Sequence, residues 1–282
     1  MTIPEGMILV LLAAGSALLI VRIRIAVRMC IAGIKNKDKK EYETGFSKTI
    51  GDRQTQEDEY GITETQEGIM AVLADGMGKN SGGRIAARIA VQVFLDLFED
   101  GNTFYNPQYS LRKAFQGANR EILNQLEEEQ GTASVAAVML RDRMLYYAAV
   151  GSVKVAVFRN HELVPLTMGH TIGMLARKKY EEGKLTKQEA VRLLDDCRLY
   201  NYVGQDGFHD IEFFDAPVRL YGGEYVVLMS DGLYETARFP DIEKCLEGEG
   251  SPQDKAYRII ELVNQSDKDG KDNASVVILK VG

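Results

Sequence analysis

Acidic residues followed by glycine stand at the end of two apolar segments of the chain. Residues 69–74 carry no charge and lead into Asp75, and residues 225–230 lead into Asp231. Short apolar segments of this kind are typical of buried strands, and a glycine at the end lets the backbone turn tightly and approach a ligand. One such pair alone is most often a simple turn. Two copies together predict that both aspartates belong to one shared site.

More carboxylates and one arginine stand in two further motifs. Residues 51–58 (GDRQTQED) contain Arg53 and then the adjacent acids Glu57 and Asp58, and Asp272 comes just before the final apolar segment. Carboxylates gathered in one partly buried place repel one another by several kcal/mol, so they take up either protons or cations. Oxygen donors without nearby His or Cys favour Mg²⁺ or Mn²⁺ over zinc or copper. The motifs therefore predict a site for hard divalent cations.

Two such ions can activate water for hydrolysis, and an in-line attack at phosphorus is one reaction that they support. Two ions about 3.5 to 4 Å apart lower the pKa of a shared water toward neutrality, and the water then attacks phosphorus in line. No protein nucleophile is required. The planar guanidinium of Arg53 can form two parallel hydrogen bonds, which lysine does not reproduce. Outside this motif, a surface salt bridge would be the ordinary interpretation of Arg53.

Four motifs in this order resemble those of a known family. They are GDRQTQED, VLADGMG, LMSDGLYE and KDNASVVILKV. Their order and separations, over residues 45–281, resemble the metal-dependent serine/threonine protein phosphatases (type 2C, or PPM), here of the bacterial type with an N-terminal membrane anchor. The resemblance implies an α+β fold, a four-layer α-β-β-α sandwich of two mainly antiparallel sheets flanked by helices. The metal site would lie at one end, beside a flap at about residues 167–208.

The resemblance also assigns roles to the matching positions. Asp58 would bridge two Mn²⁺ or Mg²⁺ ions, and Arg53 would bind the phosphate, so that both are catalytic. One ion would be held by Asp75 and the carbonyl of Gly76, and the other by Asp231 and Asp272, while Glu57 would hold metal-bound waters. The metal-binding set is then Glu57, Asp58, Asp75, Gly76, Asp231 and Asp272.

Three positions depart from the family pattern. Met77 stands where some members have a histidine that helps protonate the leaving group, and Lys79 replaces a usual glycine. Proton delivery would then fall to a metal-bound water, which predicts a slower enzyme. Ser152 stands where the family has an aspartate that helps to hold a third metal. Two metal ions are therefore expected, and the third site is in question.

Charge and cysteine content exclude several other classes. The formal net charge is −7, and because residues 1–40 carry +5, the remaining 242 residues carry −12. Such an acidic body argues against a nucleic-acid partner. The cysteines Cys30, Cys197 and Cys245 are odd in number and widely spaced, so they predict neither a disulfide framework nor a zinc site.

The N-terminal stretch favours a membrane anchor. Residues 7–21 are uncharged, and all the basic residues of the first 40 follow them. A spanning helix needs ~20 apolar residues, so the segment is short, but snorkelling arginines would add length. A cleaved signal peptide would carry its positive charge before the apolar core, and a buried N-terminal helix is the plainer alternative. We expect an anchor at 1–28, a basic linker at 29–44 and a catalytic domain at 45–282, on the cytoplasmic side of the cell membrane.

Residue patterns give the expected elements of the catalytic domain. Helical spacing of apolar residues predicts the core faces of two helices. The first face consists of Ile85, Ile89, Val93 and Leu97, and the second of Leu111, Phe115, Ala118, Ile122 and Leu126. Residues 131–140, 144–150 and 153–158 read as a strand meander, and strands are expected again within 211–220. A capping box at residues 186–189 predicts a helix start. His161, His170 and His209 lie in polar stretches and are expected to be exposed.

Three functions fit these observations. The first is a membrane-tethered phosphatase acting on phosphoserine and phosphothreonine of cytoplasmic proteins, with a membrane serine/threonine kinase as a partner by family analogy. The second is a phosphatase-like module that binds phosphoproteins without turnover, which Met77, Lys79 and Ser152 favour. Retention of Arg53 and of every carboxylate argues against it. The third, a small-molecule phosphatase or a nuclease, would use the same ions.

Overall fold

The computed structural model describes Arg22, residues 41–126 and residues 131–282. The chain divides into two units, residues 1–41 with Gly282 and residues 42–281, and the strands and helices given below belong to the second unit. In chain order its elements are β1 (Tyr42–Thr49), β2 (Glu59–Thr65), β3 (Gly68–Gly78), α2 (Gly82–Glu99), α3 (Pro107–Gln125), β4 (Gly131–Arg141), β5 (Met144–Val150), β6 (Lys154–Arg159), β7 (Glu162–Pro165), α4 (Ile172–Glu181), α5 (Lys187–Leu193), β8 (Glu212–Phe213), β9 (Val218–Arg219), β10 (Tyr225–Met229), α6 (Asp231–Tyr234), α7 (Phe239–Glu247), α8 (Pro252–Asn264) and β11 (Ala274–Val281).

The strands form two antiparallel sheets. One has the order β1-β11-β10-β6-β7, and the other has the order β2-β3-β4-β5-β8, with β9 also paired to β5. The first strand of the unit pairs along its whole length with the last one, from Tyr42 opposite Val281 to Thr49 opposite Ala274. Because of this pairing, the motifs at the two ends of the sequence emerge side by side at one end of the first sheet.

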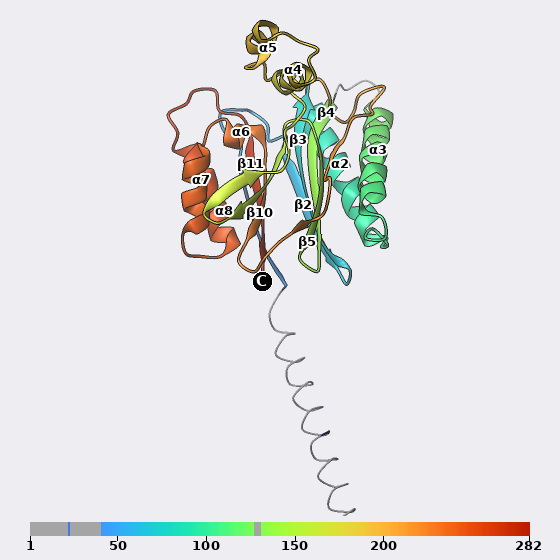
Figure 1. Cartoon of the computed structure of the whole chain (residues 1–282), viewed down its shortest axis with the longest axis vertical. Helices are drawn as coiled ribbons and strands as arrows, with labels where there is room; N and C mark the ends of the chain where they lie inside the picture. Colours follow the sequence, from blue (N-terminus) through green and yellow to red (C-terminus); the bar gives the residue numbers. More distant parts are fainter. Residues whose placement is uncertain (1–21, 23–40, 127–130) are drawn as a thin grey trace, which may run out of the picture. The chain divides into compact units, whose positions relative to one another are not determined.

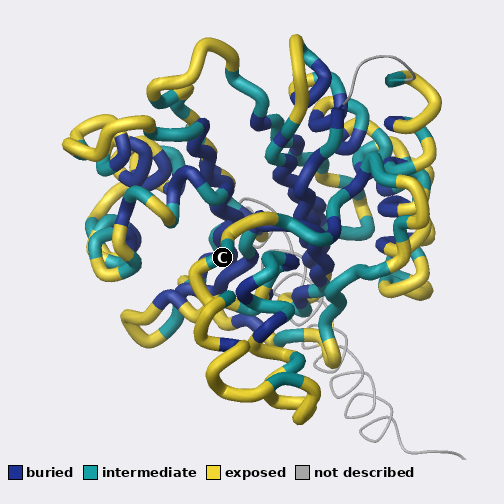
Figure 2. The backbone as a smooth tube through the Cα atoms, turned by 90° about the horizontal axis from the view of Figure 1, so that it is seen from above, coloured by how far each residue is buried: buried dark blue, intermediate teal, exposed yellow. Residues whose placement is uncertain are grey.

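Helices cover the outer face of each sheet, giving four layers (Figure 1). One core lies between α2, α3 and the β3–β4–β5 sheet, a second lies between the two sheets, and a third lies between α7, α8 and the β10–β11 sheet. The buried residues accordingly lie mainly in the strands and on the inner faces of the helices (Figure 2). The predicted sandwich of two antiparallel sheets flanked by helices is confirmed.

The core face of α2 differs from the sequence prediction by one position. Ile85, Ile89, Val93 and Leu97 are only partly buried, and the fully buried stripe is Ala86, Ala90, Phe94 and Phe98. Alanine allows the helix axis to approach the sheet closely, while the larger residues lie at its flanks and pack against the same core. The face predicted for α3 is confirmed from Leu111 to Ile122, but Leu126 is the C-cap and only partly buried.

Two strand predictions need correction. The strand β3 does not stop at residue 74, because β4 continues to pair with it as far as Gly78, with Asp75 opposite Ser134. Asp75 is therefore held inside a sheet rather than in a turn after it. The region 211–220 contains only the two short strands β8 and β9, which pair with different parts of β5.

The inserted segment between β7 and β8 carries α4 and α5 at one end of the sandwich (Figure 1). Thr186 and Glu189 form the predicted capping box at the start of α5. His170 was expected to be exposed, but it is only 4% exposed. Its Nδ1 accepts a hydrogen bond from the Gly151 amide at 3.0 Å and its ring packs edge-on against Tyr200. His161 and His209 are exposed, as predicted.

The predicted anchor and most of the predicted linker lie outside the described residues. Within the described part of the chain, none of the helices combines the length and the apolar character needed to cross a membrane.

Candidate active site

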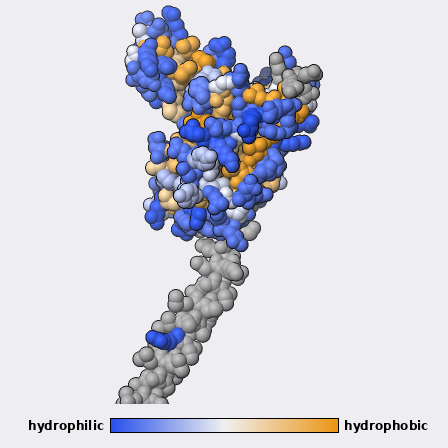
Figure 3. All heavy atoms as spheres, turned by 90° about the vertical axis from the view of Figure 1, so that its right-hand side faces the viewer, coloured by the Kyte–Doolittle hydropathy of each residue, from blue (hydrophilic) through white to orange (hydrophobic). Residues whose placement is uncertain are grey.

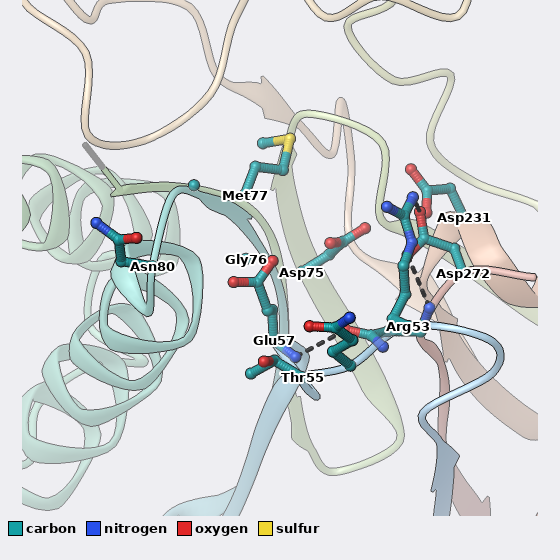
Figure 4. Close-up of a pocket in the computed structure, with 12 residues that line it drawn as sticks. Arg53, Thr55, Glu57, Asp75, Gly76, Met77, Asn80, Asp231 and Asp272 are labelled. Carbon is teal, nitrogen blue, oxygen red and sulfur yellow. Dashed lines mark hydrogen bonds and ion pairs between the residues drawn. The ribbon is translucent and has the colours of Figure 1, made fainter. Parts of the chain in front are cut away.

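A cavity of about 650 Å³ collects most of the residues singled out by the motifs. We call it the acidic cavity. Figure 4 shows Asp75 pointing into it, between Glu57 on one side and Asp231 and Asp272 on the other. It is lined by Arg53, Gln54, Thr55, Glu57, Asp75, Gly76, Met77, Gly78, Asn80, Asp231, Asp272 and Asn273.

Gly76 allows three segments to meet at the edge of the cavity. A Cβ atom at this position would lie 2.2 Å from the carbonyl oxygen of Gly83 in α2 and 2.7 Å from that of Glu57. Both contacts are far too short for any side chain. The start of α2 and the loop before β2 can therefore approach β3 only because residue 76 is glycine.

Asp58 links the two sheets beneath the cavity. It is only 1% exposed, and its Oδ2 accepts a hydrogen bond from the Ser230 hydroxyl at 2.9 Å. The same hydroxyl accepts from the Ser275 amide at 2.9 Å, which fixes it between β10 and β11. The other oxygen, Oδ1, is buried and has no hydrogen-bond partner among the described residues. A buried anionic oxygen without a partner is costly, so Oδ1 is suited to accept a cation or a proton.

The electrostatics of the cluster agree with that interpretation. Burial, together with the nearby carboxylates of Asp231 and Asp272, raises the pKa of Asp58 to about 7. Burial and the charges of Asp231 and Asp58 raise the pKa of Asp75 well above its usual range. Burial, and next the charge of Asp272, also raise the pKa of Glu57. These carboxyl groups therefore favour a bound proton unless a cation neutralises them.

The remaining site residues come from two loops that are tied together. The Asp52 amide donates to the Lys271 carbonyl at 2.9 Å, and the Lys271 amide donates to the Asp52 carboxylate at 2.9 Å. Asn273 accepts a hydrogen bond from the Glu57 amide at 2.7 Å and donates to the Ile50 carbonyl at 2.9 Å. The carboxylates of residues 57 and 272 are thus positioned by a shared network.

Arg53 forms an ion pair with Asp272, with 2.6 Å between its Nη2 atom and the carboxylate oxygen. Both side chains are about half exposed. The salt bridge that the sequence analysis gave as the plainer interpretation of Arg53 therefore exists, and it forms inside the acidic cavity with one of the predicted metal ligands.

The motifs and the fold agree with a single family. A family model described as protein phosphatase 2C matches residues 47–249. The chain is a member of the protein phosphatase 2C family. The resemblance to this family, inferred from the four motifs, is thereby confirmed, and the predicted membrane anchor stays a prediction.

Curated relatives and solved structures support the same assignment. The serine/threonine phosphatase stp of Listeria monocytogenes is 27% identical over 237 residues, which cover 81% of this chain and 91% of that protein. The protein phosphatase PhpP of Streptococcus pneumoniae is 25% identical, covering 75% and 85%. A serine/threonine phosphatase structure from S. agalactiae has 25% identity and a TM-score of 0.73, covering 86% of this chain and all of that one. The PstP catalytic domain, solved with two manganese ions, has 23% identity and a TM-score of 0.66, covering 85% and 98%.

The protein phosphatase 2C site of this chain has the donors that a divalent cation requires. Its carboxylates converge, three of them have a raised pKa, and Asp58 keeps a buried oxygen without a partner among the described residues. In the described ranges, however, no three His, Cys, Asp or Glu side chains are already arranged around one metal position. Asp272, for example, is engaged by Arg53. The residues present fit a cation-binding role, and their individual roles stay predictions.

Ser152, the position that puts a third metal in question, is occupied in hydrogen bonding within the protein. Its hydroxyl lies 3.1 Å from that of Ser134, and its amide donates to the same Ser134 oxygen at 3.0 Å. Tyr234, which follows Asp231 in α6, donates to the Ser152 carbonyl at 2.8 Å. Ser152 therefore serves to hold the loop before β6 against α6.

Two supporting residues were missed by the sequence analysis. Ser230 and Asn273 were quoted within the motifs, each next to a predicted metal ligand, but received no role. Their contribution depends on which backbone groups lie opposite, and that information comes only from the pairing of β1, β10 and β11. A polar residue directly beside a predicted ligand is the signal that would have identified them.

Proposed function

We propose that this chain hydrolyses phosphoserine and phosphothreonine side chains of proteins, using divalent cations held in the acidic cavity. The observation that supports this most strongly is a set of acidic residues and one arginine around one cavity in a protein phosphatase 2C fold. The cavity is lined by Arg53, Glu57, Asp75, Asp231 and Asp272, and Asp58 is buried beneath it. The curated relatives are named as serine/threonine phosphatases, which supports the same substrate class.

The carboxylates would bind cations, and Arg53 would bind the phosphate. Asp58, Asp75, Asp231 and Asp272 would hold two Mn²⁺ or Mg²⁺ ions, which when bound supply a nucleophile by lowering the pKa of water. Asp272 would exchange its present partner, Arg53, for a cation. The guanidinium, about half exposed at the mouth of the cavity, is then available for two oxygens of a phosphate.

Position 77 of the cavity lining does not supply an acid that could protonate the leaving group. The thioether of Met77 cannot donate a proton to the departing seryl or threonyl oxygen. We expect that proton to come from water, so that turnover depends on the basicity of the leaving group. Phenolic esters, whose leaving oxygen needs no proton, should react faster than alkyl esters.

A metal-dependent peptide assay tests this proposal. The full chain is incubated with a phosphothreonine peptide and with Mn²⁺, Mg²⁺ or EDTA, and released phosphate is measured. We expect release with Mn²⁺ or Mg²⁺ and none with EDTA. Metal binding without phosphate release from any peptide would instead support the phosphoprotein-binding module.

We further propose that the chain is a single-pass membrane protein with its catalytic domain in the cytoplasm. The support is the uncharged segment 7–21 and the basic residues that follow it. Tethering would favour phosphoproteins at the membrane, including a serine/threonine kinase of the same membrane.

Alkaline extraction of membranes tests the tether. The full chain should remain in the membrane pellet, and a variant with Leu12→Arg and Leu18→Arg should be extracted, because charge in the centre of a span costs about 2.5 to 3.5 kcal/mol per residue. Extraction of the unmodified chain would rule the tether out.

A further inference from the structure

A second cavity, of about 630 Å³, lies directly beside the acidic cavity. We call it the α3 cavity. Met77 and Gly78, at the end of β3, line both cavities, so only this short stretch separates them. The α3 cavity is lined by Met77, Gly78, Lys79, Ile122, Leu123, Leu126, Gly131, Thr132, Tyr202, Gly204, Gln205 and Asp206.

The side chains of the α3 cavity suit an apolar ligand group. Ile122, Leu123 and Leu126 come from the last turn and C-cap of α3, and Met77 faces them from β3. Leu123 is 40% exposed, although it belongs to a helix whose other leucine, Leu111, is buried. On the side of the molecule formed by α2 and α3, Figure 3 likewise shows hydrophobic patches among hydrophilic surface.

The charges at the rim do not favour an ion. Among the described residues, Lys79 and Asp206 are the charged ones that line the cavity, and they are exposed and opposite in sign. The apolar floor formed by Ile122, Leu123 and Leu126 favours burial of an aliphatic or aromatic side chain. The acidic cavity beside it is lined instead by four carboxylates.

The wall of the α3 cavity is held in place before any ligand binds. Asn119 of α3 accepts hydrogen bonds from the amides of Gly204 and Gln205 at 2.6 and 3.1 Å, and donates to the Gln205 carbonyl at 3.2 Å. Ala133 and Val203 exchange two backbone hydrogen bonds, each of 3.0 Å. A pre-formed wall lowers the entropy cost of binding.

Because the α3 cavity adjoins the acidic cavity, we propose that it is a specificity site for the phosphoprotein substrate. It binds an apolar side chain close in sequence to the phosphorylated residue while the phosphate occupies the acidic cavity. The occupant is part of the substrate chain because the two cavities share Met77 and Gly78, so one extended segment can reach both. This inference rests on the proposed phosphatase function.

A leucine walk through a peptide tests the proposal on the unmodified full chain. Phosphothreonine peptides of glycine and serine carry one leucine at each position from three residues before to three after the phosphothreonine. We expect leucine at one position to raise kcat/KM about tenfold over the leucine-free peptide, and the other positions to change it little. Less than a twofold effect at every position would overturn the proposal.

A variant then assigns the preference to this cavity. In Leu123→Glu, the ratio of kcat/KM for the favoured leucine peptide to that for the leucine-free peptide should fall to near one, and arginine at the same position should become favoured. Val164→Glu is the matched control, because Val164 is comparably exposed, at 37%, on β7 and lines none of the cavities described above. A leucine preference that survives Leu123→Glu would place the apolar site elsewhere.

The outcomes separate this inference from the proposed function. No Mn²⁺-dependent hydrolysis of p-nitrophenyl phosphate or of any peptide would remove the proposed function itself. Hydrolysis of p-nitrophenyl phosphate with a flat leucine walk would leave the phosphatase intact and remove only the specificity site.

Discussion

The acidic cavity and the α3 cavity are neighbours of similar size but opposite physical character. The first is lined by carboxyl groups, among them Asp75 with its raised pKa, and the buried Asp58 with its unpartnered oxygen lies beneath it. The second is lined by aliphatic side chains, and its polar wall is satisfied by the hydrogen bonds of Asn119. The negative charge of the first cavity attracts cations, and bound cations together with Arg53 can then hold a phosphate. The second cavity selects an apolar group by its size and shape. Reaction chemistry and substrate choice thus occupy separate places that meet at Met77.

The largest effect should come from removing one carboxylate of the acidic cavity. Asp231→Asn should lower kcat/KM for every phosphate ester by about 10³-fold or more, since a bound cation supplies several kcal/mol of transition-state stabilisation. The control is Asp241→Asn, the same chemical change at a carboxylate of α7 that is paired with Arg238 and Lys244. Phosphate release from p-nitrophenyl phosphate measures both. Equal activities of the two variants would contradict a catalytic role for Asp231.

Cation binding should also stabilise the fold, and more so at higher pH. The pKa of Asp58 is raised from 3.8 to about 7, so the folded state holds a proton that the unfolded state has lost. The unfolding free energy of the metal-free protein should therefore fall as pH rises from about 4 to about 7. Mn²⁺ at 100 times its Kd adds about 2.7 kcal/mol, or about 5 to 10 °C in Tm.

Thermal unfolding with EDTA and with Mn²⁺, from pH 5 to pH 8, measures this. Protons compete with the metal, so the gap between the two melting temperatures should widen toward pH 8. A gap that stays constant or narrows would mean that the buried carboxylates do not bind the ion.

A smaller effect is expected when the charge of Arg53 is kept but its shape is changed. Arg53→Lys should lower kcat/KM about thirtyfold, because one of two charge-assisted hydrogen bonds to phosphate is lost. Arg198→Lys, in the segment that carries α4 and α5, is the control, because Arg198 pairs only locally with Asp196. If the two variants keep the same kcat/KM, Arg53 is only a surface partner of Asp272.

The smallest effect should arise at the wall of the α3 cavity. Asn119→Ala removes three hydrogen bonds and should cost about 1 to 3 kcal/mol of unfolding free energy. The kcat/KM ratio of leucine to leucine-free peptide should fall a few-fold, while the carboxylates of the acidic cavity keep their partners. Chemical unfolding and the peptide pair measure the two effects. A larger loss on p-nitrophenyl phosphate than on the ratio would show that the cavities are not independent.

The same comparison explains what the sequence could predict. Asp75 and Asp231 were found because charge interrupts an apolar strand pattern, and the layered fold followed from the four motifs and the strand meander. The α3 cavity was not found, because Leu123 looks like any other leucine of an amphipathic helix. Its exposure depends on where the loop at residues 201–206 crosses the end of α3, which is a tertiary relation.

Tertiary packing also explains why the predictions for His170 and for the core face of α2 were wrong. His170 lies in a polar stretch, yet the Gly151 amide and Tyr200 bury it. The buried stripe of α2 was displaced because close packing on the sheet selects alanine over isoleucine. Local pattern predicts which elements exist, and the partner element decides which face is covered.

A crystal of the full chain grown with Mn²⁺ tests the central claim most directly, through the anomalous scattering of manganese. We expect two peaks in the acidic cavity, within coordination distance of Asp58, Asp75, Asp231 and Asp272, with Arg53 released from Asp272. Strong manganese peaks elsewhere and none between these carboxylates would contradict the account.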